Sequence, residues 1–255
     1  MANTRFDRVI VRRPDLRAPF PRRFAARLTG QTVLAVERRA KYLVLPLSSQ
    51  ETLLMHLGMS GWFDVGRAHD APRDGRHDHV VFYMSSGAIV TFSDPRRFGF
   101  MDLIATDTMP EHPVLGTLGP EPLSPEFDAA ALARAVRGRK TPLKVALLDQ
   151  RVVAGLGNIY AAEALHVARL SPQRAASTIA TRSGAPREPA VRLAAAIKQV
   201  LSEAIARQSS PSYRDDRFRV YDREAERCRR ARCGGTIRRR TQAGRSTFFC
   251  PVCQR

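Results

Sequence analysis

The sequence predicts an α+β protein of several domains, in which a β-sandwich is followed by a helical domain and a small C-terminal module held by four cysteines. Three observations predict this order. Short apolar and β-branched runs dominate the N-terminal part, helical runs follow Pro120, and every cysteine lies at position 228 or later. We therefore expect three domains, at residues 1–119, 120–215 and 216–255.

The expected strands are short runs that suit a pleated, half-buried surface. Val80–Met84 and Ala88–Phe92 flank Ser85-Ser86-Gly87, a composition typical of a hairpin turn. Several short strands at close spacing indicate a sandwich or barrel. The remaining expected strands are Thr32–Glu37, Tyr42–Leu47 and Thr52–Leu57.

The helical part begins after Pro120. Ser124-Pro125-Glu126 predicts a helix start, with serine as the cap and proline in the first turn. We expect loops at 171–188 and 208–219. The expected helices cover 126–137, 141–150 and 158–167, followed by an amphipathic helix that ends near Arg207 and has Leu193, Ile197, Val200, Leu201 and Ala204 on its apolar face.

The charge predicts a polyanionic partner. Lys and Arg number 42 against 24 Asp and Glu, a net charge of +18. Nucleic acid is the first candidate, and anionic membranes or acidic proteins are alternatives. No apolar run approaches the roughly 20 residues of a membrane span, and the N-terminus has no apolar signal region. We therefore expect a cytoplasmic, nucleoid-associated protein without a membrane partner.

The cysteine spacing predicts a zinc finger. Four residues separate Cys228 from Cys233, sixteen follow, and two separate Cys250 from Cys253. Two close thiolate pairs supply the tetrahedral ligand set that Zn²⁺ prefers, and four thiolates leave no open position for water. We expect one structural Zn²⁺, with four free thiols as the alternative.

Arginines surround this module. Arg238-Arg239-Arg240 and Arg245 lie between the two cysteine pairs. A small metal-held hairpin with this charge is suited to phosphate contacts, and a merely solvated basic face is the alternative.

Four motifs resemble one protein family. They are His56-Leu57-Gly58-Met59-Ser60-Gly61, Asp94-Pro95-Arg96-Arg97-Phe98-Gly99, Gly157-Asn158-Ile159-Tyr160-Ala161-Ala162-Glu163 and Gly244-Arg245-Ser246-Thr247-Phe248-Phe249-Cys250. In this order along the chain they are similar to formamidopyrimidine-DNA glycosylases, and the resemblance covers about Arg5 to Arg255.

The resemblance implies a fold and an activity. The fold is a β-sandwich, a domain with a helix–two-turn–helix, and a zinc finger. The activity is excision of oxidised purines from double-stranded DNA by a monomer, followed by cleavage of the abasic site through a Schiff base with β,δ-elimination. Such an enzyme must extrude its target base from the duplex.

The resemblance also implies residue roles. Met59, Arg96 and Phe98 form the wedge that fills the space left by the extruded base, although core packing is the alternative for Met59 and Phe98. Lys41 and Arg245 are the expected catalytic residues for β- and δ-elimination. Asn158 is expected to grip a phosphate at a helix N-terminus, with a simple N-cap as the other reading. Further expected DNA contacts are His77, Arg97, Arg139, Lys140 and Lys144.

The N-terminus departs from the family pattern. The family nucleophile is an N-terminal proline, followed by a catalytic glutamate, and its secondary amine forms the imine. Here Met1-Ala2-Asn3-Thr4 opens the sequence, the first proline is Pro14 and the first glutamate is Glu37. We expect the family's first helix, with both residues, to be missing from this sequence.

Three explanations stay open for this departure. The start codon is assigned too late, the gene encodes a shortened protein that binds lesions without cutting, or Lys41 or the Ala2 amine is a weaker nucleophile. In-frame codons for Met-Pro-Glu-Leu-Pro-Glu upstream of Met1 would support the first. A second departure is the short segment at 209–219, where the family has a longer glycine-rich loop over the extruded purine, so the preferred lesion stays open.

Three hypotheses about function follow. The leading one is a DNA glycosylase and abasic-site lyase of base-excision repair. The second is a catalytically impaired protein that binds damaged DNA. The third is a zinc-ribbon protein that binds RNA, which the wedge motif disfavours.

Overall fold

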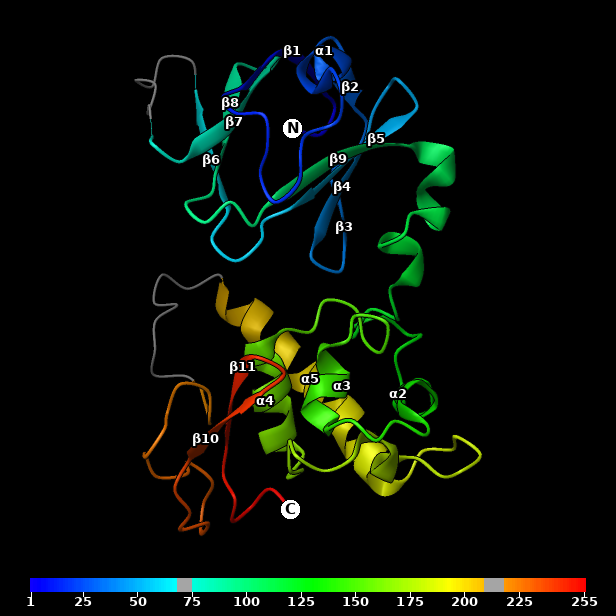
Figure 1. The fold of residues 1–255 in the computed structure, drawn as a ribbon, viewed down its shortest axis with the longest axis vertical. Coiled ribbons are helices and arrows are strands. Elements are labelled where there is room, and N and C mark those ends of the chain that lie inside the picture. The colour runs from blue at the N-terminus through cyan, green and yellow to red at the C-terminus, as the bar shows by residue number, and fades with distance from the viewer. Residues whose placement is uncertain (68–74, 209–217) are drawn as a thin grey trace. The chain divides into compact units, whose positions relative to one another are not determined.

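The chain forms two compact units, Met1–Gly116 and Thr117–Arg255. The computed structural model describes residues 1–67, 75–208 and 218–255 (Figure 1). The expected loop at 209–219 therefore lies almost entirely outside the described residues. No helix in the described ranges is long and apolar enough to cross a membrane.

The first unit contains two antiparallel sheets. The five-stranded sheet has the order β2-β1-β7-β8-β6, and the four-stranded sheet has the order β3-β4-β5-β9. The strands are β1 (Thr4–Val11), β2 (Thr32–Val33), β3 (Glu37–Arg39), β4 (Tyr42–Pro46), β5 (Glu51–His56), β6 (Trp62–Arg67), β7 (Asp78–Met84), β8 (Ala88–Ser93) and β9 (Phe100–Ala105).

One hydrophobic core joins the two sheets. Phe6 and Phe82 of the larger sheet pack with their ring centroids 5.5 Å apart. Leu45 and Leu53 of the smaller sheet belong to the same buried cluster. Helix α1 (Phe24–Leu28) buries Phe24 and Leu28. The predicted β-sandwich is therefore confirmed.

The strand predictions succeed where apolar residues run together. β4, β5, β7 and β8 lie within two residues of the expected bounds, and Gly87 turns the predicted hairpin with a φ of 79°. The expected strand Thr32–Glu37 is wrong in part, because the chain leaves β2 after Val33 and enters β3 only at Glu37. Between these two strands, Leu34 and Val36 are exposed.

Strands β1, β6 and β9 were not predicted. In β1, a register shift between Phe6 and Arg8 interrupts the pairing with β7. The buried residues Phe6 and Val9 are consequently three positions apart instead of two. A bulge of this kind removes the alternation that identifies a strand in a sequence.

The second unit packs helices around its own core. They are α2 (Ala129–Val136), α3 (Leu143–Leu148), α4 (Asn158–Val167) and α5 (Glu188–Gln208). A 3-10 turn of this unit, η3 (Ala176–Ile179), lies within the expected loop at 171–188, while η1 (Thr106–Glu111) belongs to the first unit and η2 (Leu115–Thr117) spans the boundary between the units.

The helix predictions differ mainly at the ends. The expected start at Ser124 is wrong: the Ser124 hydroxyl donates to the Glu121 carbonyl at 3.0 Å, and Asp128 caps α2 by accepting from the Ala131 amide at 2.6 Å. Helix α3 is shorter than the expected 141–150, and α5 begins earlier than its apolar face indicated. Helix α4 has the bounds that were predicted.

The C-terminal part of this unit contains a two-stranded hairpin. Strands β10 (Arg238–Gln242) and β11 (Arg245–Phe249) pair in antiparallel register. Ala243 and Gly244 connect them with positive φ angles of 47° and 72°, as tight hairpin turns require. The hairpin places Arg245 at the first position of β11.

Candidate nucleic-acid interface and zinc centre

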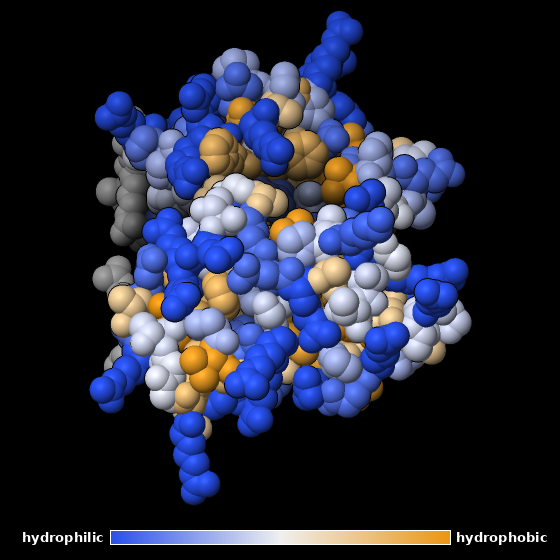
Figure 2. Space-filling model, turned by 60° about the horizontal axis from the view of Figure 1, so that its bottom comes forward, coloured by the Kyte–Doolittle hydropathy of each residue, from blue (hydrophilic) through white to orange (hydrophobic). Residues whose placement is uncertain are grey.

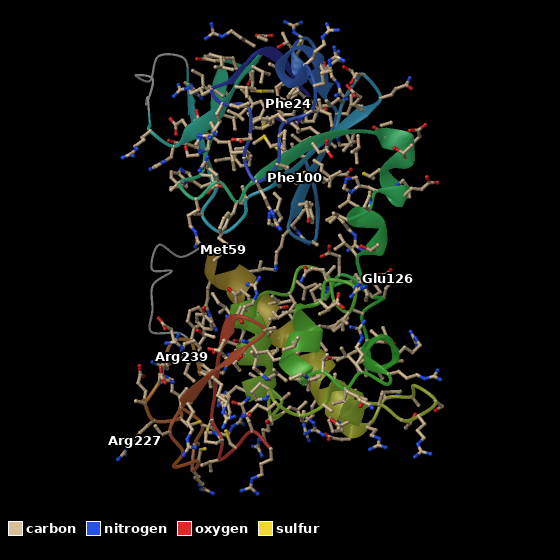
Figure 3. The ribbon with its side chains drawn as sticks, viewed as in Figure 1. Phe24, Met59, Phe100, Glu126, Arg227 and Arg239 are labelled. Atoms are coloured by element: carbon tan, nitrogen blue, oxygen red, sulfur yellow. The ribbon has the colours of Figure 1, made fainter. Side chains whose placement is uncertain are left out.

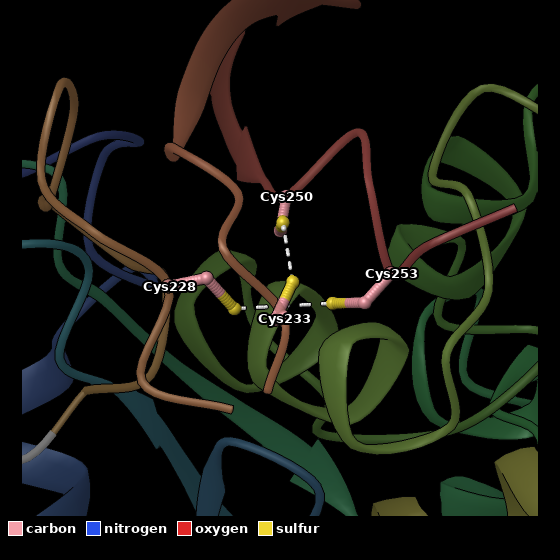
Figure 4. Close-up of side chains that lie close together, drawn as sticks. All are labelled: Cys228, Cys233, Cys250 and Cys253. Carbon is pink, nitrogen blue, oxygen red and sulfur yellow. Dashed lines mark hydrogen bonds between the residues drawn. The ribbon is translucent and has the colours of Figure 1, made fainter. Parts of the chain in front are cut away.

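The four cysteines converge on one point of the second unit (Figure 4). Their sulfur atoms all lie within 4.8 Å of one another. The Cys228–Cys253 and Cys233–Cys250 sulfur pairs are 3.9 and 3.6 Å apart. A tetrahedron with Zn–S bonds of about 2.3 Å has edges of about 3.8 Å, so the sulfur positions fit Zn²⁺.

The surroundings of the sulfurs also favour a cation. Burial raises the pKa of the Cys228 and Cys253 thiols, and coordination to a metal ion deprotonates such thiols. The His166 Nε2 atom lies 3.3 Å from the Cys228 sulfur. Burial lowers the pKa of His166 to about 4, so a neutral imidazole faces the metal ligand. The zinc is structural, because the four thiolates complete its coordination.

Helix α4 anchors this zinc finger. Glu163 is 2% exposed, and its carboxylate accepts from the backbone amides of Arg219, Val220 and Tyr221 at 2.8–3.0 Å. Arg230 donates to the carbonyl of His166 in the last turn of α4. The segment that enters the finger is thus fixed to one helix.

Asn158 opens the same helix. Gly157 is the N-cap and supplies no side chain, so the simple N-cap role for Asn158 is not what the structure shows. Instead, the Asn158 Oδ1 atom accepts from the Lys144 ammonium at 2.6 Å, and its Nδ2 atom donates to the Ser246 carbonyl at 3.1 Å. The uncapped amides of the first turn and the helix dipole favour an anion here.

Lys144 holds this arrangement together. It is 1% exposed, and its ammonium also donates to the Ser246 carbonyl at 2.9 Å and the Thr247 hydroxyl at 2.8 Å. Burial, and then the charge of Arg245, lowers the pKa of Lys144 to about 8. The contacts connect the start of α4 to β11 of the finger.

The other predicted cations of this unit differ in exposure. Arg139 donates to the Asp149 carboxylate at 2.8 Å. Hydrogen bonds, from Arg151 first and then from Arg139, hold the pKa of Asp149 well below its usual value. Lys140 and Arg245 are exposed.

In the first unit, two turns carry exposed apolar tips. Met59 lies in the turn between β5 and β6 and is 67% exposed (Figure 3). Phe98 lies between β8 and β9 and is 41% exposed. The Arg96 guanidinium carbon lies 4.7 Å from the centre of the Phe98 ring. Core packing, the alternative for both apolar residues, is therefore excluded, while their role as a wedge stays a prediction.

Lys41 lies in the turn between β3 and β4, and the structure places a further candidate near it. Burial, and then the charges of Lys41 and Arg17, lower the pKa of His56. The His56 ring lies 4.9 Å from the Tyr42 ring, and its Nδ1 atom accepts from the Gly58 amide at 2.9 Å. Sequence reasoning did not select His56, although it opens the motif that contains Met59.

His77 and Arg97 occupy different positions. His77 directly precedes β7, is half-buried, and its carbonyl accepts from the Asp94 amide at 3.0 Å. Arg97 is exposed and has a φ of 56°, a conformation that non-glycine residues seldom adopt.

Charged side chains are plentiful outside these sites as well. Hydrophilic residues dominate the face shown in Figure 2, where hydrophobic ones are scattered. The net charge of +18 makes most of the ionised groups cationic. The fold, the zinc finger and the basic surface together define a class, the zinc-containing DNA-binding proteins.

Three family models match successive parts of the chain. The formamidopyrimidine-DNA glycosylase N-terminal domain matches residues 1–101, and the formamidopyrimidine-DNA glycosylase H2TH domain matches residues 118–215. A zinc finger found in FPG and IleRS matches residues 225–255.

Similar proteins and structures agree with these matches. A formamidopyrimidine-DNA glycosylase of Rhodopseudomonas palustris (strain HaA2) is 56% identical, covering 100% of this chain and 94% of the relative. One from Bradyrhizobium diazoefficiens is 55% identical, covering 96% and 90%. The Lactococcus lactis enzyme non-covalently bound to DNA containing an AP site has a TM-score of 0.86 at 30% identity, covering 100% and 94%. A MutM structure with carbocyclic 8-oxo-G DNA has a TM-score of 0.85 at 30% identity, with the same coverage.

The chain therefore belongs to the formamidopyrimidine-DNA glycosylase family. This is an enzyme family, and its members are DNA glycosylases of base-excision repair.

Proposed function

We propose that this protein excises oxidised purines from double-stranded DNA and then cleaves the abasic strand through a Schiff base with β,δ-elimination. The observation that carries the proposal is the pair of exposed apolar tips, Met59 and Phe98, on tight turns beside Arg96. Exposed apolar side chains that enter a base stack offset part of the cost of extruding a base. Carbocyclic 8-oxo-G DNA is bound by a similar MutM, which supports an oxidised purine as substrate.

Each wedge residue has its own task in this proposal. Met59 and Phe98 fill the space vacated by the extruded nucleotide. Arg96 donates hydrogen bonds to the base left without its partner, since a guanidinium presents several donors in one plane. Arg97 and His77 contact the DNA backbone nearby.

A second group of residues binds phosphates. The amide-rich start of α4, with Asn158 at its first position, receives one phosphate. The 2.6 Å hydrogen bond from the Lys144 ammonium keeps the Asn158 side chain oriented. The buried Lys144 also adds positive charge behind Asn158. The exposed Lys140 and the partly exposed Arg139 extend the contact along the backbone.

Each elimination step breaks a C–O bond of the sugar and expels a phosphate, so a cation close to that phosphate stabilises the leaving group. We assign β-elimination to Lys41, and phosphate clamping with δ-elimination to Arg245. Both are exposed, Lys41 in the turn between β3 and β4 and Arg245 at the start of β11. His56, whose pKa is lowered by burial and by Lys41, is added as a neutral hydrogen-bond donor for a phosphate beside Lys41.

The setting of this activity is also part of the proposal. We expect a monomer that acts in the cytoplasm on nucleoid DNA, with domains at 1–119, 120–215 and 216–255. The zinc finger supplies the β-hairpin that carries Arg245.

A strand-cleavage assay tests the proposed function. The protein is purified from its own cells through a C-terminal tag, so that the cell's own amino terminus is kept. We expect it to nick duplexes that carry 8-oxoguanine opposite cytosine and to leave phosphates at both ends. The double variant Met59→Ala/Phe98→Ala is expected to lose at least about tenfold in rate, because unstacking costs a few kcal/mol per step.

The same assay distinguishes the proposed enzyme from the second candidate, a protein that binds damaged DNA without cutting it. Lesion-selective binding without release of the base would identify a damaged-DNA-binding protein and overturn the proposed chemistry. Equal action on undamaged duplex would overturn the lesion specificity.

A further inference from the structure

Asp94 is a fully buried carboxylate at the end of β8, with 0% of its surface exposed. Its Oδ1 atom accepts from the Ser60 hydroxyl at 2.6 Å and from the Arg96 amide at 3.3 Å. Its Oδ2 atom accepts from the Gly99 amide at 2.7 Å. The donors come from two separate segments, which we name the Met59 loop (residues 57–61) and the Phe98 loop (residues 95–99).

Ser60 connects these loops directly as well. Its hydroxyl donates to Asp94 and accepts from the Arg96 amide at 3.3 Å. Through Ser60, the Met59 loop is therefore hydrogen-bonded to both Asp94 and Arg96, the residues on either side of Pro95. Hydrogen bonds to an ionised acceptor are stronger than neutral ones, and leaving such an acceptor buried without donors is costly.

Asp94 is itself fixed by the larger sheet. Its amide donates to the carbonyl of His77 at 3.0 Å, and its carbonyl lies 2.8 Å from the Nε2 atom of the buried His79. The backbone of Asp94 is thus held by His77 and by His79 of β7, while its carboxylate accepts from both loops.

The two loops also touch at the backbone. A Cβ atom on Gly58 would lie 2.5 Å from the carbonyl carbon of Phe98, and Gly58 has a φ of 68°. A Cβ atom on Gly61 or Gly99 would lie 2.9 or 2.6 Å from the Phe92 ring. Only residues without a side chain permit this approach, so the loops pack on each other and on the same ring.

We propose that Ser60 and Asp94 lock the Met59 loop and the Phe98 loop into one rigid unit, so that both apolar tips enter the DNA together. Asp94 and Ser60 are positioning residues in this view, because they act through Met59, Arg96 and Phe98. The inference deepens the proposed function and rests on it. A preorganised wedge avoids the loss of loop entropy that separate ordering of two mobile tips would cost on binding.

A matched pair of serine variants tests the lock. Ser60→Ala removes the side-chain hydrogen bonds that connect the loops and leaves their backbone contact in place. Ser93→Ala removes another serine–aspartate hydrogen bond in the same sheet, to Asp78, and neither of these residues belongs to the Met59 loop or the Phe98 loop. Both variants of the full chain are compared with the parent protein, and thermal unfolding measures the structural cost of each.

The readout is binding to two DNAs that carry the same tetrahydrofuran abasic analogue. In one the analogue is opposite cytosine, so that the wedge must enter the stack. In the other it is opposite a one-nucleotide gap, which leaves no orphaned base to contact. We expect Ser60→Ala to weaken binding about tenfold on the first DNA and less than about twofold on the second, since tenfold corresponds to one charge-assisted hydrogen bond. Ser93→Ala is expected to leave the ratio of the two affinities unchanged.

Two further measurements keep the outcomes apart. The double variant Met59→Ala/Phe98→Ala must itself lower the ratio of the affinity for the first DNA to the affinity for the second. If this ratio does not fall, both the wedge and the proposed function are overturned. If it does, but Ser60→Ala leaves the ratio unchanged, only the lock is overturned. In the Met59→Ala/Phe98→Ala background, Ser60→Ala is expected to add much less than its tenfold loss, because Arg96 is the only wedge residue left to position. A full additional loss would show that Ser60 acts elsewhere and would also overturn the lock.

Discussion

At the scale of single residues, Lys144 shows how a charge is used inside this protein. The side chain is 1% exposed and makes hydrogen bonds to Asn158, Ser246 and Thr247. Burial of a charge without hydrogen-bond partners is costly, and these oxygens offset part of that cost. The residue therefore orients Asn158, to which we assign a phosphate contact, at some expense of stability.

The pKa of Lys144 predicts a pH dependence. It is lowered from 10.5 to about 8 in the folded protein. Between these values the unfolded chain holds a proton that the folded chain has released, so the free energy of unfolding rises as the pH rises through this window. The full rise is about 3 kcal/mol.

Denaturation by urea at pH 7.5 to 10.5 measures this effect. Lys144→Met removes the titrating group, and the difference between parent and variant isolates it from other titrations. A difference that stays constant across the window would contradict the lowered pKa. Lys144→Met is also expected to weaken DNA binding, because Asn158 loses its hydrogen-bond donor.

At the scale of elements, α4 serves two tasks. Its first residue, Asn158, is proposed to contact a phosphate, and its later turns hold the zinc finger through Glu163 and His166. The bounds of this helix were predicted, but its contacts were not. Glu163 accepts amides that are 56 to 58 positions further along the chain, and no local pattern reports such a contact.

The Glu163 anchor predicts a large stability effect. Glu163→Gln keeps the shape but loses the charge and one acceptor oxygen, so one or two buried amides lose their partner. We expect a loss of about 2–3 kcal/mol in the free energy of unfolding. Glu188→Gln is the control, since Glu188 pairs with Arg192 on the exposed surface of α5, where about 0.5 kcal/mol is expected. Similar losses for both variants would show that Glu163 is not an anchor.

The zinc centre predicts a separate result. Metal analysis is expected to find one zinc per chain. Removal of zinc by a chelator should lower DNA affinity strongly, because the hairpin that carries Arg245 depends on the metal for its fold. Well under one zinc per chain, or unchanged affinity after removal, would contradict the structural role.

At the scale of the whole molecule, the sequence predicted the order of sandwich, helices and zinc finger because each has a local signal. Apolar runs marked β4, β5, β7 and β8, and cysteine spacing marked the finger. Strand β1 was not predicted, because its bulge interrupts the alternation of buried and exposed residues. The residues proposed for the wedge and for phosphate contacts followed from motifs, whereas the Lys144 and Asp94 networks depend on contacts between distant segments and needed the structure.

Central to the proposed function is a covalent imine between the protein and the sugar of an oxidised purine nucleotide. Borohydride reduction during reaction with 8-oxoguanine duplex tests it most directly, with the tagged protein from its own cells. We predict a covalent protein–DNA adduct that is absent with undamaged duplex. Retained lesion binding without any adduct would contradict the account.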